Sequence, residues 1–435
     1  LTLKEVENLI SENSPELKVM RRRVEQSKEL LKTTIAKWYP SINITATGLP
    51  EYYSTDSDRN PNFGSDTKGS QWRTSMNLRV QWNLIDPTRT PSIAAAKDEY
   101  EKAKESYLII LRDLRLRAAS QYFLLQRADE GVRIGKQSMK ASLVSLRDAK
   151  ARFEAGVAAR LEVLEAETQL ARDKQLLTRK LGDQKITRRA LASSLNLPSG
   201  ISPIAASSAQ VIGSWKASLE ESIIAAYSFR EELNQLLLDI SINNSNANIA
   251  LADTQPIFSL VNSLGYTNIQ GQTGVNTGTS IDMNDYSTTV SNTIGVNASW
   301  KIFDGGRSKA FYRYNKLKAK EAEESFTLKR NSIRQEVEES FFNLQVANQD
   351  IATTTREVLA SRESLRLARL RFQAGVTTQR EVVNNQRDLT QAEVRYSDAI
   401  TTYNTSLSEL RRRTGIDHIK ACTPKEYIYK TKENN

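Results

Sequence analysis

The sequence predicts a mostly α-helical chain that also carries a transmembrane β-barrel portion and is built as two similar halves. Three observations lead to this fold class. Long stretches repeat apolar residues at helical spacing, and four short segments alternate apolar and polar residues as strands do. Matching landmarks also recur 216 to 219 positions apart along the 435 residues. A repeat of this length determines the architecture before any single residue does.

The clearest landmark is a short motif that interrupts a long helical pattern once in each half. Residues 152–158 read RFEAGVA and residues 371–377 read RFQAGVT, 219 positions later. Each motif contains a glycine, Gly156 or Gly375, which favours a left-handed turn at the end of a helix. We therefore expect two helical hairpins with these motifs at their tips.

The first half, residues 1–213, follows the order helix, strand, long loop, strand, very long helix, tip, helix. Pro15 is expected to interrupt the first helix, and Pro40 to end it, because proline cannot continue the hydrogen-bond ladder. The expected ranges are a helix at about 1–37, strands at about 41–49 and 74–85 around the loop 50–71, helices at about 91–153 and 160–195, and a linker to residue 213.

The strand at 74–85 alternates strictly over about ten residues, which is the length of a bilayer-crossing strand. Met76, Leu78, Val80 and Trp82 alternate with polar residues. A half-buried strand of a soluble sheet would give the same pattern, so this segment alone is only suggestive.

The second half, residues 214–416, replays that order. Trp300 and Asp304, at the end of the fourth strand, correspond to Trp82 and Asp86 at the end of the second strand. The expected ranges are a helix at about 215–252, strands at about 257–266 and 288–303 around the loop 267–289, helices at about 306–372 and 379–412, and a polar tail at 417–435.

Composition excludes several classes of function. The chain has one cysteine, Cys422, and one histidine, His418, which argues against a disulfide, a metal site and a Ser-His-Asp triad. No cofactor and no enzymatic activity are expected. The net charge of +10 raises nucleic acid as a partner. However, positive and negative residues are interleaved along the helices, which is typical of a solvated helix face, so we expect no nucleic-acid binding.

Four strands cannot close a barrel alone, because open sheet edges are not tolerated in lipid and the smallest bilayer barrels have about eight strands. Several copies of the chain would have to share one barrel. Trp72, Trp82 and Trp300 are expected at strand ends, where they would suit aromatic girdles or be ordinary strand aromatics. The helices carry narrow apolar stripes and charged remaining faces. Twelve of them could ring a water-filled cylinder, with a solid bundle as the competing arrangement.

At these tips the chain resembles the TolC family of outer-membrane efflux proteins. The resemblance rests on the repeated Arg-Phe-x-Ala-Gly-Val motif, on the segments EVLEAE and EVVNNQ that begin at Glu162 and Glu381, and on the Trp-x-x-x-Asp strand exits. It covers about residues 3–416.

The resemblance implies a homotrimer with a 12-strand outer-membrane β-barrel, continued by a 12-helix periplasmic α-barrel tunnel. Such a protein is the exit duct of tripartite drug-efflux pumps and type I secretion systems in bacteria of the Gram-negative type. Its partners would be outer-membrane lipid, a periplasmic adaptor (membrane fusion) protein and an inner-membrane RND or ABC transporter, which supplies the energy.

The resemblance also implies site residues. The tips would dock the adaptor through Arg152, Phe153, Gly156, Val157, Arg371, Phe372, Gly375 and Val376. A pore constriction would comprise Glu162, Phe372, Thr377, Glu381 and Asn384. Here Phe372 stands where family members can have a gate tyrosine, Thr377 replaces a gate arginine, and Asn384 replaces a second acid. Glu165 and Glu167 are expected on an exposed helix surface.

Two alternatives from other classes remain at this stage. One is a coiled-coil scaffold whose strands form a small soluble sheet, and the other is a nucleic-acid-binding scaffold that rests only on net charge. Since Leu1 opens directly into a helical pattern, the sequence is expected to be either a cytosolic protein or a mature form after signal removal. A lipid anchor on an N-terminal cysteine is not expected in this form.

Overall fold

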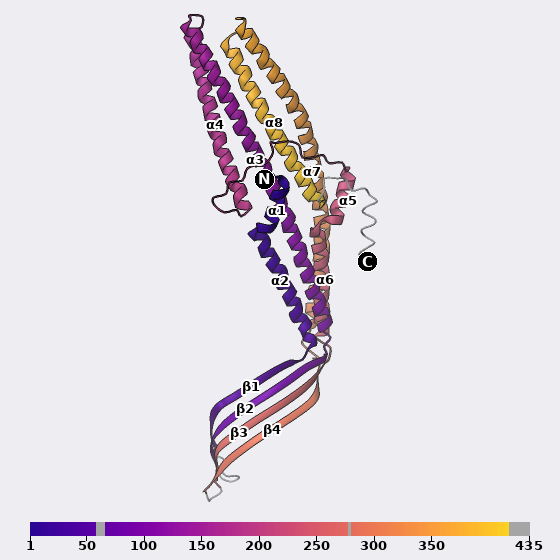
Figure 1. Cartoon of the computed structure of the whole chain (residues 1–435). Coiled ribbons are helices and arrows are strands. Elements are labelled where there is room, and N and C mark those ends of the chain that lie inside the picture. Colours follow the sequence, from indigo (N-terminus) through magenta and orange to yellow (C-terminus); the bar gives the residue numbers. More distant parts are fainter. Residues whose placement is uncertain (58–65, 277–279, 417–435) are drawn as a thin grey trace. The chain divides into compact units, whose positions relative to one another are not determined.

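The computed structural model describes residues 1–57, 66–276 and 280–416 (Figure 1). Cys422, His418 and the predicted tail at 417–435 lie outside the described residues. The elements are α1 (Leu3–Asn13), α2 (Pro15–Ile35), a 3-10 turn η1 (Ala36–Trp38), β1 (Ser41–Ser57), β2 (Asp66–Ile85), α3 (Arg89–Glu154), α4 (Arg160–Ser194), α5 (Leu219–Phe229), α6 (Glu231–Ala252), β3 (Ile257–Asn276), β4 (Ser280–Ser299), α7 (Arg307–Gln373) and α8 (Gln379–Thr414). Across the described residues, none of the helices combines the length and apolarity that crossing a bilayer would take.

Contacts divide the chain into two compact units, each of which takes segments from both halves of the sequence. One unit comprises Leu1–Val24, Lys102–Leu237 and Glu324–Asn435, and the other comprises Glu25–Glu101 and Leu238–Glu323. The first contains the hairpin tips, and the second contains the sheet.

The sheet is antiparallel in the order β1-β2-β3-β4, and its strands lie side by side in Figure 1. Three of its strands extend well into the predicted loops 50–71 and 267–289, which was the main error in the predicted ranges. These segments are rich in Gly, Asn, Thr and Asp, which are poor strand formers except for Thr. Cross-strand pairing of β2 with β3 from Asp66 to Ile85 overrides that preference.

Strand β4 also begins earlier than predicted and ends at Ser299, not near residue 303. Its end is fixed by the next residues. The Trp300 indole Nε1 donates to the Thr254 carbonyl over 3.0 Å, and the Asp304 carboxylate accepts from the Ser308 amide over 2.9 Å, capping α7. The Trp82 indole makes the equivalent bond to the Trp38 carbonyl at 2.9 Å.

The register gives the sheet one apolar face and one polar face. Cross-strand neighbours such as Leu78 and Leu264 share the apolar face, and Asn77 and Ser263 share the polar one, where the serine hydroxyl donates to the amide oxygen over 2.8 Å. The apolar face carries Ile42, Ile44, Ala46, Met76, Leu78, Val80, Trp82, Phe258, Leu260, Leu264, Tyr266, Val290, Ile294, Val296 and Ala298.

Trp72 is not at a strand end, as had been expected, because β2 continues beyond it to Asp66. It lies on the apolar face against Tyr52 of β1, with ring centroids 5.0 Å apart. Trp82 lies on the same face ten residues along, so the two tryptophans bracket the apolar band of β2.

The first helical segment has the expected interruption. Pro15 is the first residue of α2, where its missing N–H costs nothing, and the buried Ser14 closes α1. The predicted single helix at 215–252 is wrong in two respects. It begins at Leu219, after a capping box formed by Ser218 and Glu221, and it breaks at Arg230 without any proline.

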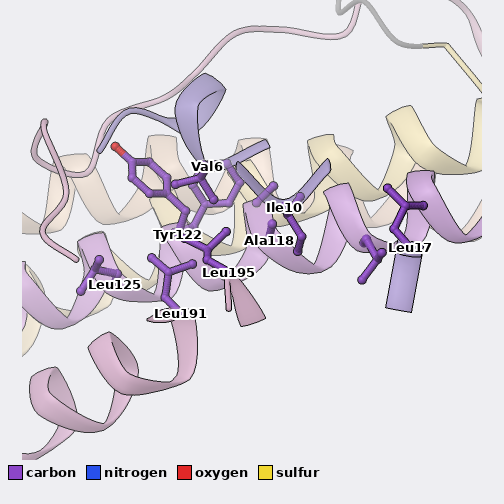
Figure 2. Close-up of a cluster of buried hydrophobic side chains, with 11 residues drawn as sticks. Val6, Ile10, Leu17, Ala118, Tyr122, Leu125, Leu191 and Leu195 are labelled. Carbon is purple, nitrogen blue, oxygen red and sulfur yellow. The ribbon is translucent and has the colours of Figure 1, made fainter. Parts of the chain in front are cut away.

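Short helices pack on long ones through apolar side chains (Figure 2). Val6 and Ile10 of α1 contact Tyr122 of α3 and the residues Leu191 and Leu195 around the end of α4. In the second half, Leu233 of α6 packs with Ile333 and Val337 of α7 and with Leu407 and Leu410 of α8. Some apolar residues of the long helices are exposed in the single chain, notably Leu108, Leu143, Leu161 and Leu164.

A buried ion-pair network holds the break between α5 and α6. The Arg230 guanidinium, 2% exposed, contacts the Glu232 carboxylate at 2.9 Å and the Glu336 carboxylate at 2.6 Å. Arg412 of α8 joins Glu232 at 2.9 Å and Asp113 of α3 at 2.7 Å. Burial opposes ionisation of Glu232 and Glu336, yet the basic groups around them outweigh it and lower both pKa values to about 2. Arg230 acts on both carboxylates, Arg412 acts on Glu232, and Lys329 and Arg413 act on Glu336.

These lowered pKa values predict acid sensitivity. A carboxylate with a depressed folded-state pKa contributes its stability above its unfolded pKa of about 4.3 and loses it as pH falls toward 2. The contribution of Glu336 is at most about 3 kcal/mol. We expect Glu336→Gln to lower the melting temperature in detergent at pH 7 and to reduce its decline between pH 5 and pH 2.5.

Glu338→Gln is the matched control, because Glu338 lies on the same helix in an exposed pair with Arg334. An acid decline in Glu336→Gln as steep as that of the unmodified protein would contradict the assignment.

Candidate functional site: the two hairpin tips

The tips join α3 to α4 and α7 to α8 by the same backbone turn. In the first tip the Val157 amide donates to the Arg152 carbonyl and the Gly156 amide to the Phe153 carbonyl, both at 3.0 Å. In the second, the corresponding bonds at Val376 and Gly375 measure 2.9 and 3.0 Å. This pair of bonds is the Schellman motif, which satisfies the last carbonyls of a helix.

The turn requires a residue with positive φ. Gly156 has φ of 75° and Gly375 has φ of 76°. A Cβ atom at either position would meet no other atom within 4 Å. The requirement for glycine is therefore conformational and not steric.

The two tip phenylalanines, although equivalent in sequence, lie in different surroundings. Phe153 is 44% exposed, whereas Phe372 packs against a cluster of Leu365, Ala368, Val382 and Leu389. Val157 and Val376 are 65% and 69% exposed. Each tip thus presents an apolar side chain that nothing in the described chain covers.

Three contacts tie the first hairpin to the second near the tips. The Arg152 guanidinium lies over the Phe372 ring, 4.5 Å from its centroid, and the Arg152 Nε is buried without a hydrogen-bond partner among the described residues. Arg380 of α8 pairs with Glu165 of α4 at 2.5 Å. Gln379, which is buried, donates from Nε2 to the Ser145 hydroxyl of α3.

Glu165 therefore does not lie on an open helix surface as expected. Its side chain is 22% exposed and forms the ion pair between hairpins. Glu167 does lie at the surface, where it pairs with Lys150 at 3.2 Å. Sequence spacing within one hairpin carries no information about contacts between hairpins, which is why the pair with Arg380 was missed.

The predicted acids occupy the third position of α4 and α8. A carboxylate there is favoured by the helix macrodipole. Glu381 also pairs with Arg371 at 3.1 Å, across its own tip, and accepts a hydrogen bond from the Thr377 hydroxyl. The Glu162 Oε2 atom is buried without a hydrogen-bond partner in the described part of the chain.

The structure thus brings together part of the predicted constriction set. Phe372, Thr377 and Glu381 lie around the second tip, Asn384 is exposed three residues further along α8, and Glu162 lies in the first tip. The pair Arg371–Glu381 was not foreseen. The signal for it existed, because Arg371 lies two residues before the end of α7 and Glu381 two residues after the start of α8.

Comparisons with known proteins cover nearly the whole described chain. Residues 7–197 and 225–416 match the outer membrane efflux protein family. Outer membrane protein TolC of Vibrio cholerae serotype O1 is 22% identical over 377 residues, with 86% of this chain and 81% of that protein covered.

Solved structures have the same fold at low sequence identity. The chain superimposes on CusC with a TM-score of 0.78 at 16% identity, covering 95% of this chain and 92% of that one. For the CmeC outer membrane channel of Campylobacter jejuni the TM-score is 0.76 at 16% identity, with coverage of 99% and 89%.

The shared turn predicts a cost for any side chain at Gly375. An L residue held at positive φ costs about 1–2 kcal/mol. We expect Gly375→Ala to open the tip more often and to speed amide hydrogen exchange in residues 370–380 roughly five- to thirtyfold.

Gly182→Ala is the control, because Gly182 lies within α4 and an added Cβ would also meet nothing within 4 Å. Gly182→Ala should leave amide exchange in residues 370–380 unchanged and should slow exchange around residue 182, since alanine favours helix. If Gly375→Ala left the amide exchange rates of residues 370–380 unchanged, the left-handed turn would not control how often the tip opens.

Proposed function

Because the chain belongs to the outer membrane efflux protein family, we propose that it is the exit duct of a tripartite efflux pump or a type I secretion system. The duct is passive. It carries small molecules such as drugs and toxic compounds, or secreted proteins, from a periplasmic adaptor and an inner-membrane RND or ABC transporter to the outside. The family consists of outer-membrane channel proteins, and membership disfavours the scaffold alternatives. The resemblance inferred from the tip motifs is confirmed.

The observation that carries this proposal is the open sheet with one apolar face. Strands β1 and β4 are its edges, and each has one row of backbone groups without a strand partner in the described chain. In lipid such groups must be paired, so the sheet needs further strands from other copies. Since the four strands are antiparallel, β4 of one copy can continue the pattern beside β1 of the next. Three copies give a barrel of twelve strands.

The height of the apolar face supports a bilayer-spanning barrel. The ten residue steps from Trp72 to Trp82 extend about 33 Å along β2, at about 3.3 Å per residue. A strand tilt near 45° reduces this to about 23 Å, close to the apolar band of outer-membrane barrels. Tyr52 with Trp72 would form one aromatic girdle, and Trp82 with Trp300 the other.

The long helices would form the periplasmic tunnel of a trimer. Each chain supplies α3, α4, α7 and α8, and three chains give twelve. Their exposed apolar side chains support contact with another copy, since Leu108, Leu143, Phe342 and Val346 all lie uncovered in the single chain. We also propose that residues 1–213 and 214–416 are structural repeats, each contributing half of the barrel strands and of these helices.

The tips would dock the adaptor through the eight residues inferred from the motif. Exposed Phe153, Val157 and Val376 offer apolar contact, while Gly156 and Gly375 shape the turns. The same region would form the gated constriction, with opening by separation of the hairpins. The contact of Arg152 with Phe372 supports a closed position in this state.

A first test concerns assembly and conduction. We expect the purified protein in detergent to have about three times the chain mass of 49.0 kDa by light scattering, and to form ion-conducting channels in planar bilayers. Heat-denatured protein serves as the negative control. A monodisperse monomer, or a trimer that never conducts, would refute the duct.

A second test concerns the acid at the constriction. Three copies of Glu381 in a narrow pore should attract cations. Glu381→Ala should lower the cation preference measured from the reversal potential in a salt gradient, and Arg371→Ala should raise it by removing the paired cation.

Glu363→Ala is the control, because Glu363 is an exposed acid on α7 that pairs with Arg366 away from the tip. The assignment of Glu381 fails if Glu381→Ala and Glu363→Ala leave the same cation preference and conductance.

A further inference from the structure

The polar face of the sheet is almost without charge along the apolar band. On β2 this face carries Arg73, Arg79 and neutral residues between and beyond them. The register places only neutral residues of β3 and β4 at the same heights, from Ser259 to Ile269 and from Ser287 to Ser299. In β1 the one charged residue on this face within the band is Glu51.

The two arginines differ in their neighbours. Arg73 lies directly opposite Glu51 across the β1–β2 ladder, so the Glu51 carboxylate offsets the positive charge of Arg73. Arg79 lies between Asn43 of β1 and Ser263 of β3, with Asn77 and Gln81 before and after it on the same face. The described residues at these neighbouring positions offer it no carboxylate.

Neutral side chains near Arg79 form hydrogen bonds with one another. The Asn77 amide oxygen accepts from the Ser263 hydroxyl at 2.8 Å, and the Asn83 amide oxygen from the Ser259 hydroxyl at 2.9 Å. The Arg79 side chain is exposed, and a guanidinium keeps its charge at all physiological pH values. It is thus an uncompensated positive charge on the face that would line the lumen.

We propose that Arg79 makes the barrel end of the duct an anion-attracting collar, which favours the export of small organic anions carrying carboxylate, phosphate or sulfonate groups. This inference rests on the proposed duct. In a trimer three Arg79 side chains would lie at one height, and a ring of arginines selects anions electrostatically. Because the surrounding face is neutral, no nearby charge cancels their field within a Debye length of about 8 Å.

The proposed collar is distinct from the proposed acidic constriction at the tips. A positive ring on an otherwise neutral face raises the local concentration of anions beside it. The two features can be separated experimentally, since Arg79 and Glu381 belong to different compact units.

The test is the reversal potential of single channels in a KCl gradient. Arg79→Gln should lower the chloride-to-potassium permeability ratio by roughly two- to tenfold, at the low end of the effect of a charged cleft. Arg79→Glu should lower it further. The double variant Arg73→Gln/Glu51→Gln is the matched control, because it removes two opposed charges from the same face without changing the net charge, and it should leave the ratio nearly unchanged.

The outcomes separate the two proposals. If the unmodified protein conducts and Arg79→Gln and Arg79→Glu keep its permeability ratio, the collar is wrong and the duct stands. If the double variant Arg73→Gln/Glu51→Gln shifts the ratio as much as Arg79→Gln does, the shift does not depend on an uncompensated charge and the collar is again wrong. If the unmodified protein forms no channel, both the proposed duct and the proposed collar are wrong.

Discussion

The pairing of backbone groups in the four-stranded sheet is the constraint on which the proposed architecture depends. Its register aligns apolar residues from all four strands on one face, from Ile42 to Ala298, and leaves β1 and β4 as edges. The apolar face of such a sheet can contact lipid, but the unpaired backbone N–H and C=O groups at its edges cannot remain there without hydrogen-bond partners. In the proposed trimer, pairing with other copies would satisfy the edges and would place the polar face toward the lumen.

The helical part is held by a different balance of interactions. Short helices contribute compact apolar clusters where they meet the long ones, as at Ile10 and Tyr122. Near the tips the two hairpins contact one another through charged groups, with Arg380–Glu165 and Arg152 over Phe372. Exposed ion pairs contribute little stability individually. Polar contacts between the hairpins are compatible with the proposed opening of the tips.

Much of the fold could be predicted from the sequence because its signals are local. The left-handed turns at Gly156 and Gly375 follow from glycine within a helical pattern, and the alternation around Leu78 identifies a strand with two faces. The extended strands were missed because Gly, Asn and Asp indicate loops, and only pairing with a partner strand makes them extended. This is also why Trp72, which was expected at an end, lies within β2.

The candidate site was predictable in its position but not in its contacts. The motif located both tips, yet nothing local distinguishes Phe153 from Phe372, since the difference arises from Arg152 and from the packing of α7 on α8. The charge on Arg79 was visible from the start. Its uncompensated state became evident only when the register identified its cross-strand neighbours.

The break at Arg230 depends on a contact from outside its own segment. Residues 219–252 contain no proline, and the segment could continue as one helix when isolated. The extended backbone at Arg230 is held by Glu336 of α7 in addition to nearby Glu232. The bend therefore belongs to the assembled helices and not to the peptide. It depends on the Arg230–Glu336 ion pair, so α7 determines where α5 ends and α6 begins.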